Sequence, residues 1–519
     1  MNQNEVTFVA LSNRGKHKYF PQEGFEELLA TKDFWIVHPM YEAIRMLKIN
    51  EIDKYIDDHV DEHIRRVQEF LRQPSVSAEN YGVRECARLL SHYYEKLGCK
   101  AVKVMETGGP HPVVYAEYDA GAEKTLLIYF MYDTQPFNEE EWTSPPLEAR
   151  LVNIEPFGKC VVGRGAINSK GPLVAFLNGL DSIRAIGDEL PFNFKFISQG
   201  DEELASRYFA DFVWKHKAML KADALFSPDA YQDRNGKVSM ELGYKGIVYF
   251  ELECNGKAWG RGPTEFGIHS SAKSWVDSPV WRMIQALATM TSEDGNKILI
   301  DGWFDNVKPL TEEDLQLIDK LAETLDEEEI KEEDKIERFL GDLHGKDLLV
   351  QYYGSTTLNI DGIWGGYTGP GSLTLLPHKV TVKMDVRLVP DQTSEEILPK
   401  MRKHLDKHGY TDIIIRPLDP YEWSKESVNE PIVQATIQAY RKMGYEPEIS
   451  PISGGSVPFY LFTSKPLKIP FTCAGLGYGA RAHAPDEYFV IEGNEKVAGL
   501  AGCEKSYVTI LDELAKLQW

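Results

Sequence analysis

Basic residues are scarce relative to acidic ones in this chain of 519 residues. Its 57 Lys and Arg stand against 80 Asp and Glu, which gives a net charge of −23. Nucleic acids and anionic membranes are bound through clustered Lys and Arg, so this balance argues against both as partners. Long apolar runs are lacking too, because no stretch approaches the roughly 20 residues that a membrane helix needs. We therefore expect a soluble protein.

Cysteine is also sparse. The six cysteines include no CxxC pair and form no dense framework, so free thiols in a reducing compartment are the simplest interpretation. The first 20 residues lack a basic segment followed by a long apolar run, and no signal peptide is predicted. We expect a cytoplasmic protein.

No internal repeat or low-complexity linker divides the chain, but its length and its 43% hydrophobic content predict two domains. Residues 1–52 are expected to form an N-terminal extension, irregular except for a short helix near 39–48. The spacing of apolar residues then predicts helices over 53–71 and 84–97.

Short apolar runs alternate with helical patterns from residue 113 to residue 226. Strands are predicted at 113–115, 125–129, 194–197 and 224–226, with helices over 171–186 and 204–219. Such alternation is typical of an α/β layer with a mostly parallel central sheet.

The pattern changes after Gly243. Residues 247–253 and 379–387 alternate like half-exposed strands, and the other elements of this part are helices near 278–291 and 394–408 and a strand near 412–416. The acidic stretch 311–337 is interpreted as a solvated helical face. The α/β pattern returns after Tyr421 with a helix at 430–443, a strand near 470–474 and a helix at 503–517. The predicted division is an α/β domain of residues 53–243 and 421–519 and an inserted α+β domain of residues 244–420.

Six short segments carry the chemistry: Met131-Tyr-Asp-Thr-Gln-Pro136, Gly163-Arg-Gly-Ala-Ile-Asn-Ser-Lys-Gly171, Gln199-Gly-Asp-Glu-Glu-Leu-Ala-Ser206, Ser227-Pro-Asp229, Ile268-His-Ser270 and Ala482-His-Ala-Pro-Asp-Glu487. In this order they resemble the active-site segments of the dizinc peptidase and amidohydrolase family, which includes carnosine dipeptidase, glutamate carboxypeptidase, acetylornithine deacetylase and aminoacylase. The resemblance implies a split catalytic α/β domain with a central, mostly parallel sheet and an inserted α+β lid and dimerisation domain.

The same resemblance implies the catalytic roles. Glu202 corresponds to the general base. Asp133 corresponds to the carboxylate that orients a metal ligand without itself binding the metal. His269 corresponds to the lid histidine that reaches the developing oxyanion, usually in the partner subunit's site. A homodimer is therefore expected.

Metal ligands are implied at Glu203, His483, Asp229 and Asn168. The family has a histidine where this chain has Met131, and a bridging aspartate where it has Asn168. A thioether is a poor ligand for a borderline divalent cation, and the amide removes one negative charge. We therefore predict one ion of zinc or another divalent metal in preference to two, with none as the remaining alternative.

The resemblance implies substrate contacts in two further segments of the chain. Arg387 resembles a lid arginine that pairs with a substrate carboxylate, for which a planar, bidentate donor is suited. Gly455 and Ser456 belong to a Gly-Gly-Ser-x-Pro loop whose backbone N–H groups can approach a carboxylate.

The main prediction is a hydrolase that cleaves an amide bond in a small carboxylate-bearing substrate, such as a dipeptide or an N-acyl amino acid. Two alternatives stay open. One is a metal-free enzyme of altered chemistry in the same pocket. The other is an inactive relative that binds a small molecule.

Overall fold

The computed structural model describes residues 7–12, 17–21, 34–36 and 47–517. The chain divides into two compact units, residues 1–46 and 47–519. In the first unit, β1 (Thr7–Ser12) pairs antiparallel with β2 (His17–Pro21) and β3 (Phe34–Ile36). The prediction of an irregular lead-in is wrong for these strands. The helix expected near 39–48 lies almost entirely outside the described residues.

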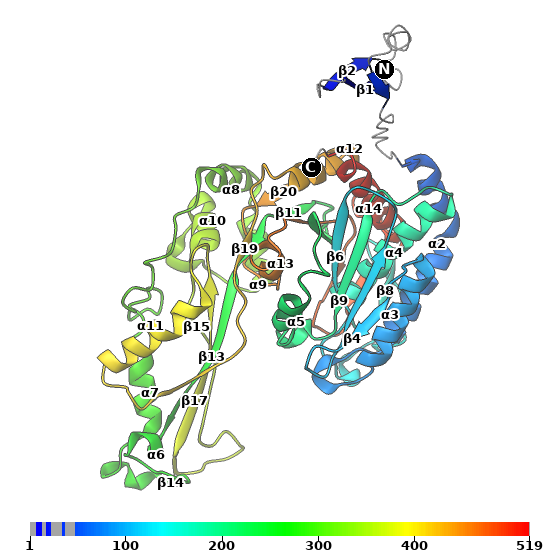
Figure 1. Ribbon diagram of the computed structural model, residues 1–519. Coiled ribbons are helices and arrows are strands. Elements are labelled where there is room, and N and C mark those ends of the chain that lie inside the picture. The colour runs from blue at the N-terminus through cyan, green and yellow to red at the C-terminus, as the bar shows by residue number, and fades with distance from the viewer. Residues whose placement is uncertain (1–6, 13–16, 22–33, 37–46, 518–519) are drawn as a thin grey trace. The chain divides into compact units, whose positions relative to one another are not determined.

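A six-stranded sheet forms the centre of the second unit, in the order β21-β10-β6-β9-β5-β4. Four neighbouring strands are parallel, namely β21 (Phe471–Ala474), β10 (Ala224–Pro228), β6 (Thr125–Met131) and β9 (Asn193–Gln199). The antiparallel strands β5 (Val113–Tyr118) and β4 (Lys103–Met105) complete one edge. The predicted mostly parallel sheet is confirmed, and Figure 1 shows β6 and β9 side by side.

Helices cover this sheet with their apolar sides. They are α2 (Ile49–Arg72), α3 (Val83–Leu97), α4 (Gly171–Ala185), α12 (Pro431–Lys442) and α14 (Leu500–Leu514). Helix α4 is buried almost along its whole length and packs against both α2 and α14, which explains its uniformly apolar sequence. Between β9 and β10, α5 spans only Phe209–His216, because Ala205 and Ser206 take positive φ angles of 62° and 48° and interrupt the helix predicted over 204–219.

A four-stranded antiparallel sheet, which we call the lid sheet, has the order β15-β17-β13-β18. Its strands are β15 (Asn359–Trp364), β17 (Lys379–Leu388), β13 (Gly246–Asn255) and β18 (Ile414–Pro417), and they run down the yellow and green part of Figure 1. Helices α7 (Pro279–Leu287) and α11 (Ser394–Lys407) pack against it. Alternate residues such as Phe250 and Val386 are buried in this core, so their neighbours in the chain, Tyr249 and Arg387, point to the opposite face.

The acidic insertion is helical. It contains α8 (Glu312–Thr324), α9 (Glu327–Asp334) and α10 (Gly345–Gly354), and α9 buries none of its residues. This agrees with the solvated face that the charge pattern predicted. All strands of the lid sheet come from residues 244–420, whereas the six-stranded sheet comes from outside this range. The exact domain boundaries at 243 and 421 stay a prediction.

A second four-stranded sheet was not predicted. It has the order β22-β23-β8-β7 and consists of β22 (Gly479–Ala480), β23 (Tyr488–Val490), β8 (Gly158–Val162) and β7 (Arg150–Ile154).

The shorter elements are β11 (Ser239–Glu241), β12 (Gly243–Tyr244), α6 (Gly256–Trp259), β14 (Ile268–His269), β16 (Leu375–Leu376), β19 (Ser424–Lys425), β20 (Glu448–Ser450) and α13 (Tyr460–Thr463). Within residues 47–517 and the three N-terminal strands, no helix is both long and apolar enough to cross a bilayer.

Candidate functional site

The predicted acids lie where the parallel strands end. Asp133 follows β6, and Glu202 and Glu203 follow β9 in a single 3₁₀ turn. The fully buried Asp133 carboxylate accepts hydrogen bonds from the backbone N–H groups of Glu202 at 3.0 Å and Glu203 at 3.1 Å. Asp133 therefore fixes the turn that presents both glutamates, at the sheet edge where α/β proteins place their ligands.

Asn168, Glu203 and His483 are brought together from distant parts of the chain. The Asn168 Nδ2 atom donates to Glu203 Oε1 at 2.8 Å and lies 2.9 Å from His483 Nε2. Glu203 Oε2 accepts a hydrogen bond of 2.8 Å from Gln135 and lies 3.3 Å from His483 Nε2. The hydrogen bond to Glu203 is the main cause that raises the pKa of His483.

A buried ion pair holds the loop that carries Asn168. Glu487 pairs with Arg164 at 2.8 Å, and the backbone N–H groups of Gly165, Ile167 and Asn168 donate to the same carboxylate at 3.0 Å each. Neither member of this pair was predicted to have a role in the site. The signal was present, because Arg164 and Glu487 both lie within segments that carry the family resemblance.

Burial controls the proton affinity of these acids. It is the largest cause that raises the pKa of Asp133 to about 8 and of Asp229 to about 7. Burial also raises the pKa of Glu202 well above its usual range, and the neighbouring charges of Glu203, Asp133 and Asp201 add to the effect. The protonated form of the Glu202 carboxyl is therefore favoured over that of an exposed glutamate.

Asp229 and Met131 complete the set of predicted positions. Asp229 ends the turn after β10, and its Oδ1 accepts the N–H of Ala230 at 2.8 Å. No hydrogen bond joins it to Glu203, His483 or Asn168 in the described part of the chain. Met131 is the last residue of β6 and is 9% exposed, as expected for a packing residue.

The structure brings together only some of the predicted metal ligands. Among residues 47–517 and the described N-terminal strands, no group of three or more His, Cys, Asp or Glu side chains is arranged to hold a metal. Glu203 and His483 nevertheless converge, and a half-turn of the Asn168 amide would add its oxygen as a third donor. These donors could together hold one ion, and the number of ions stays a prediction.

A cavity of about 240 Å³ adjoins the paired glutamates. Glu202 and Glu203 line one side, and the lid sheet contributes Arg387, Ile247 and Tyr249; the remaining lining residues are Ala205, Asp419, Tyr421, Gly455 and Ser456. Arg387 donates to Ser456 Oγ at 2.8 Å, so two of the predicted substrate contacts touch each other. Ile247 and Arg387 are opposite each other in the β13–β17 pairing.

His269 does not line this cavity. Its ring contacts Ser271 Oγ at 2.8 Å and Thr374 Oγ1 at 3.0 Å, both on the lid. A role for His269 in catalysis therefore depends on the predicted partner subunit.

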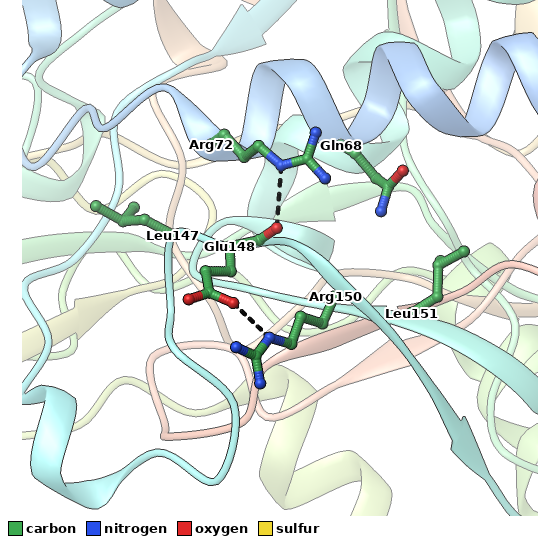
Figure 2. A pocket seen from close by; sticks show the side chains of 6 residues that line it. All are labelled: Gln68, Arg72, Leu147, Glu148, Arg150 and Leu151. Carbon is green, nitrogen blue, oxygen red and sulfur yellow. Dashed lines mark hydrogen bonds and ion pairs between the residues drawn. The ribbon is translucent and has the colours of Figure 1, made fainter.

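A larger and more open hollow of about 600 Å³ lies between the end of α2 and the start of β7 (Figure 2). Arg72 and Arg150 both point toward Glu148 there, and Gln68 donates to the backbone of Ala149. None of the predicted catalytic or ligand residues lines it. The chemistry is therefore expected in the smaller cavity.

A mostly parallel sheet with paired acids at its carboxyl edge, facing a lid arginine across a small cavity, is an arrangement suited to hydrolysis of small amides. Comparison with known families agrees. Residues 127–502 match the profile of peptidase family M20/M25/M40. The chain belongs to this family.

Individual relatives cover most of the molecule. The structure of an M20 family metallo-carboxypeptidase, Sso-CP2 from Sulfolobus solfataricus, superposes with a TM-score of 0.78 at 33% identity and covers 88% of this chain and 100% of its own. The Beta-Ala-His dipeptidase of Homo sapiens is 28% identical over 383 residues, or 69% of this chain and 71% of that protein. The Cys-Gly metallodipeptidase DUG1 of Saccharomyces cerevisiae is 26% identical over 460 residues, or 83% of this chain and 92% of its own.

These comparisons confirm the fold class and the prediction of a metal-dependent hydrolase of the peptidase type. They do not favour the metal-free and non-enzymatic alternatives. The roles of individual residues and the number of ions stay predictions.

Proposed function

We propose that this protein hydrolyses the amide bond of a small substrate with a free carboxylate, such as a dipeptide or an N-acyl amino acid. The observation that carries the proposal is the single cavity that Glu202, Glu203, Arg387 and Ser456 line together. Its volume of about 240 Å³ lies below the roughly 300–1,000 Å³ of pockets for drug-sized ligands, which favours a substrate of one or two residues.

Arg387 binds the substrate carboxylate in this proposal. A guanidinium offers two parallel N–H donors to a carboxylate, and such charge-assisted bonds are stronger than neutral ones. Ser456 orients the guanidinium, and the neighbouring Gly455 leaves its backbone accessible. A carboxylate at this position places the amide bond of a dipeptide toward Glu202 and Glu203.

Glu202 moves the proton. When ionised, it takes a proton from the attacking water; it then passes that proton to the leaving nitrogen, so the amine departs neutral. Its raised pKa suits the second step, because burial favours the protonated carboxyl that must give up its proton there. Asp133 holds the turn that aims Glu202 at the cavity.

One divalent ion, zinc or a related metal, is the proposed cofactor. Glu203 and His483 would hold it, with the oxygen of Asn168 as a third donor and Asp229 as the remaining candidate ligand. When bound, such an ion polarises a carbonyl oxygen and lowers the pKa of water.

The lid supports the proposed homodimer. Phe266, Trp275 and Trp281 are 69%, 79% and 59% exposed, and Ile360 and Ile363 on the edge strand β15 are exposed as well. Such apolar surface is typical of interaction sites. In a dimer, His269 of one subunit would approach the oxyanion in the other.

The described cysteines are all free, which supports the cytoplasmic location that we infer.

The test is turnover. The purified protein, assayed with a panel of dipeptides and N-acyl amino acids in the presence of Zn²⁺ or Mn²⁺, should release free amine from some of them. The same substrates with an amidated carboxyl group should react poorly. Absence of turnover across the panel, with a folded and metal-supplemented protein, would overturn the proposal.

A further inference from the structure

Lys245 is a buried cation next to the cavity but outside its lining. It lies between β12 and β13, where the chain enters the lid sheet, and it is 4% exposed. Its Nζ atom donates to the backbone oxygens of Tyr352 at 2.6 Å and Ser355 at 2.7 Å. Both carbonyls belong to the C-terminal end of α10, where a helix presents unpaired oxygens and partial negative charge. Lys245 therefore caps α10 with its side chain.

The residues that follow α10 hold Arg387. Thr356 Oγ1 donates to the backbone oxygen of Arg387 at 2.8 Å, and the Arg387 N–H donates to Thr357 Oγ1 at 3.1 Å. The position of the guanidinium thus depends on a segment whose start Lys245 fixes.

The loop that carries Ser456 is bonded to the backbone at Gly243 and Lys245. The Lys245 N–H donates to Ser453 O at 3.1 Å, and the Ser453 N–H donates to Gly243 O at 2.7 Å. On the other side of this loop, the Tyr352 hydroxyl lies against Gly454. A Cβ atom on Gly454 would lie 2.5 Å from that oxygen, so the fit is tight.

We propose that Lys245 is the positioning residue of the carboxylate subsite, because it fixes both Arg387 and the Ser453–Ser456 loop through the end of α10. This inference rests on the proposed function, since it assumes a substrate carboxylate at Arg387. Burial lowers the pKa of Lys245 to about 8, and the charge of Arg387 adds to this effect. The two cations repel each other, and an anion bound at Arg387 would reduce that repulsion.

The test compares a dipeptide with the same dipeptide amidated at its carboxyl terminus. Lys245→Met should raise KM for the free acid about 10-fold or more while kcat changes less than about 3-fold, because a loss of ground-state positioning acts on binding. The KM of the amide should not change. Lys245→Arg should recover much of the free-acid affinity, and Lys383→Met, an exposed lysine on the same sheet, should behave as wild type.

A purely architectural lysine would give a different result. In that case both substrates would lose affinity or turnover alike, and the proposal would be wrong. If Lys245→Met does not fold, Tyr352→Phe removes only the hydroxyl at Gly454 and should still raise KM for the free acid alone; an unchanged KM in that variant contradicts the proposal.

Binding separates this inference from the proposed function. Calorimetric titration of the same two dipeptides measures Kd without any need for turnover. If the wild-type protein binds the free acid but cleaves nothing, the hydrolase proposal fails, and a weaker free-acid Kd in Lys245→Met still supports the role of Lys245. If the wild type cleaves dipeptides and Lys245→Met binds both forms normally, only the role of Lys245 fails.

Discussion

Asn168 donates a hydrogen bond of 2.8 Å to the carboxylate of Glu203. An amide therefore occupies the place between Glu203 and His483 where the family resemblance implies a bridging carboxylate. The amide nitrogen bonds to Glu203 and lies 2.9 Å from His483 Nε2, so Asn168 contacts both of its neighbours. The number of ions then depends on this residue and on Met131.

Metal content should follow the charge at these two positions. We expect the wild-type protein to bind no more than one divalent ion per chain, and Met131→His/Asn168→Asp to bind up to two, since the variant adds an imidazole and a negative charge. Elemental analysis after dialysis measures this. Asn235→Asp adds the same charge at an exposed position and should leave the metal content unchanged. Two tightly bound ions in the wild type would contradict the expectation.

Glu202→Gln should remove proton transfer and spare binding. Loss of a general acid–base group lowers rates by typically 10²–10⁴-fold, and we expect kcat to fall within that range. The Kd for a dipeptide should change less than about 3-fold, because glutamine keeps the shape of the side chain. Steady-state kinetics and calorimetry check both values, with the exposed Glu140→Gln as the control. Near-normal turnover in Glu202→Gln would rule out its proposed role.

A shared active site makes a complementation test available. His269→Ala and Glu202→Gln chains should each be inactive, but co-expression should restore about a quarter of wild-type activity, because half of randomly assembled dimers are mixed and each has one intact site. Turnover of the mixed sample measures this. Activity no higher than the sum of the two separate variants would mean that His269 does not act in the partner's site.

The dimer itself should depend on the exposed lid aromatics. Trp275→Lys/Trp281→Lys places two charges on this apolar surface and should convert a dimer to a monomer in light scattering. Trp214, on α5, is also 46% exposed, so Trp214→Lys is a matched control that should stay dimeric. A wild-type monomer would exclude the predicted assembly.

The ionisation of Glu426 should lower the stability of the protein as the pH rises. Burial and the nearby charge of Glu430 raise its pKa from 4.5 to about 8. The folded state thus holds this proton more tightly than the unfolded state. Its contribution to the free energy of unfolding is therefore fully present below about pH 4.5 and is lost as the pH rises through about 8.

Urea unfolding at pH 5 and pH 8.5 tests this expectation. Glu426→Gln should be more stable than wild type at pH 8.5, by on the order of 2 kcal/mol, with a smaller difference at pH 5. The exposed Glu332→Gln on α9 should have the same free energy of unfolding as the wild type at both pH values. Equal stability of Glu426→Gln and wild type across the range would show that the Glu426 carboxyl ionises freely in the folded protein.

Periodic segments were predictable because burial leaves a direct signature in the order of residues. The helix predicted over 171–186 and the strands predicted at 247–253 and 379–387 correspond closely to α4, β13 and β17. Where the backbone leaves regular dihedral angles, the prediction was wrong, as at the start of α5. The sheet of β22, β23, β8 and β7 was missed because its strands are short and because β8 pairs with β23 across more than 300 residues of sequence.

The sequence by itself determined the family, the mostly parallel sheet and the identity of the acids, since these follow from residue types, spacing and order along the chain. Only the tertiary structure decided which of them meet. It placed Asn168 between Glu203 and His483, paired Arg164 with Glu487, and set the buried Lys245 behind Arg387. Such contacts join residues far apart in the chain. Their strength depends on burial and on distances of a few tenths of an ångström, which no local pattern encodes.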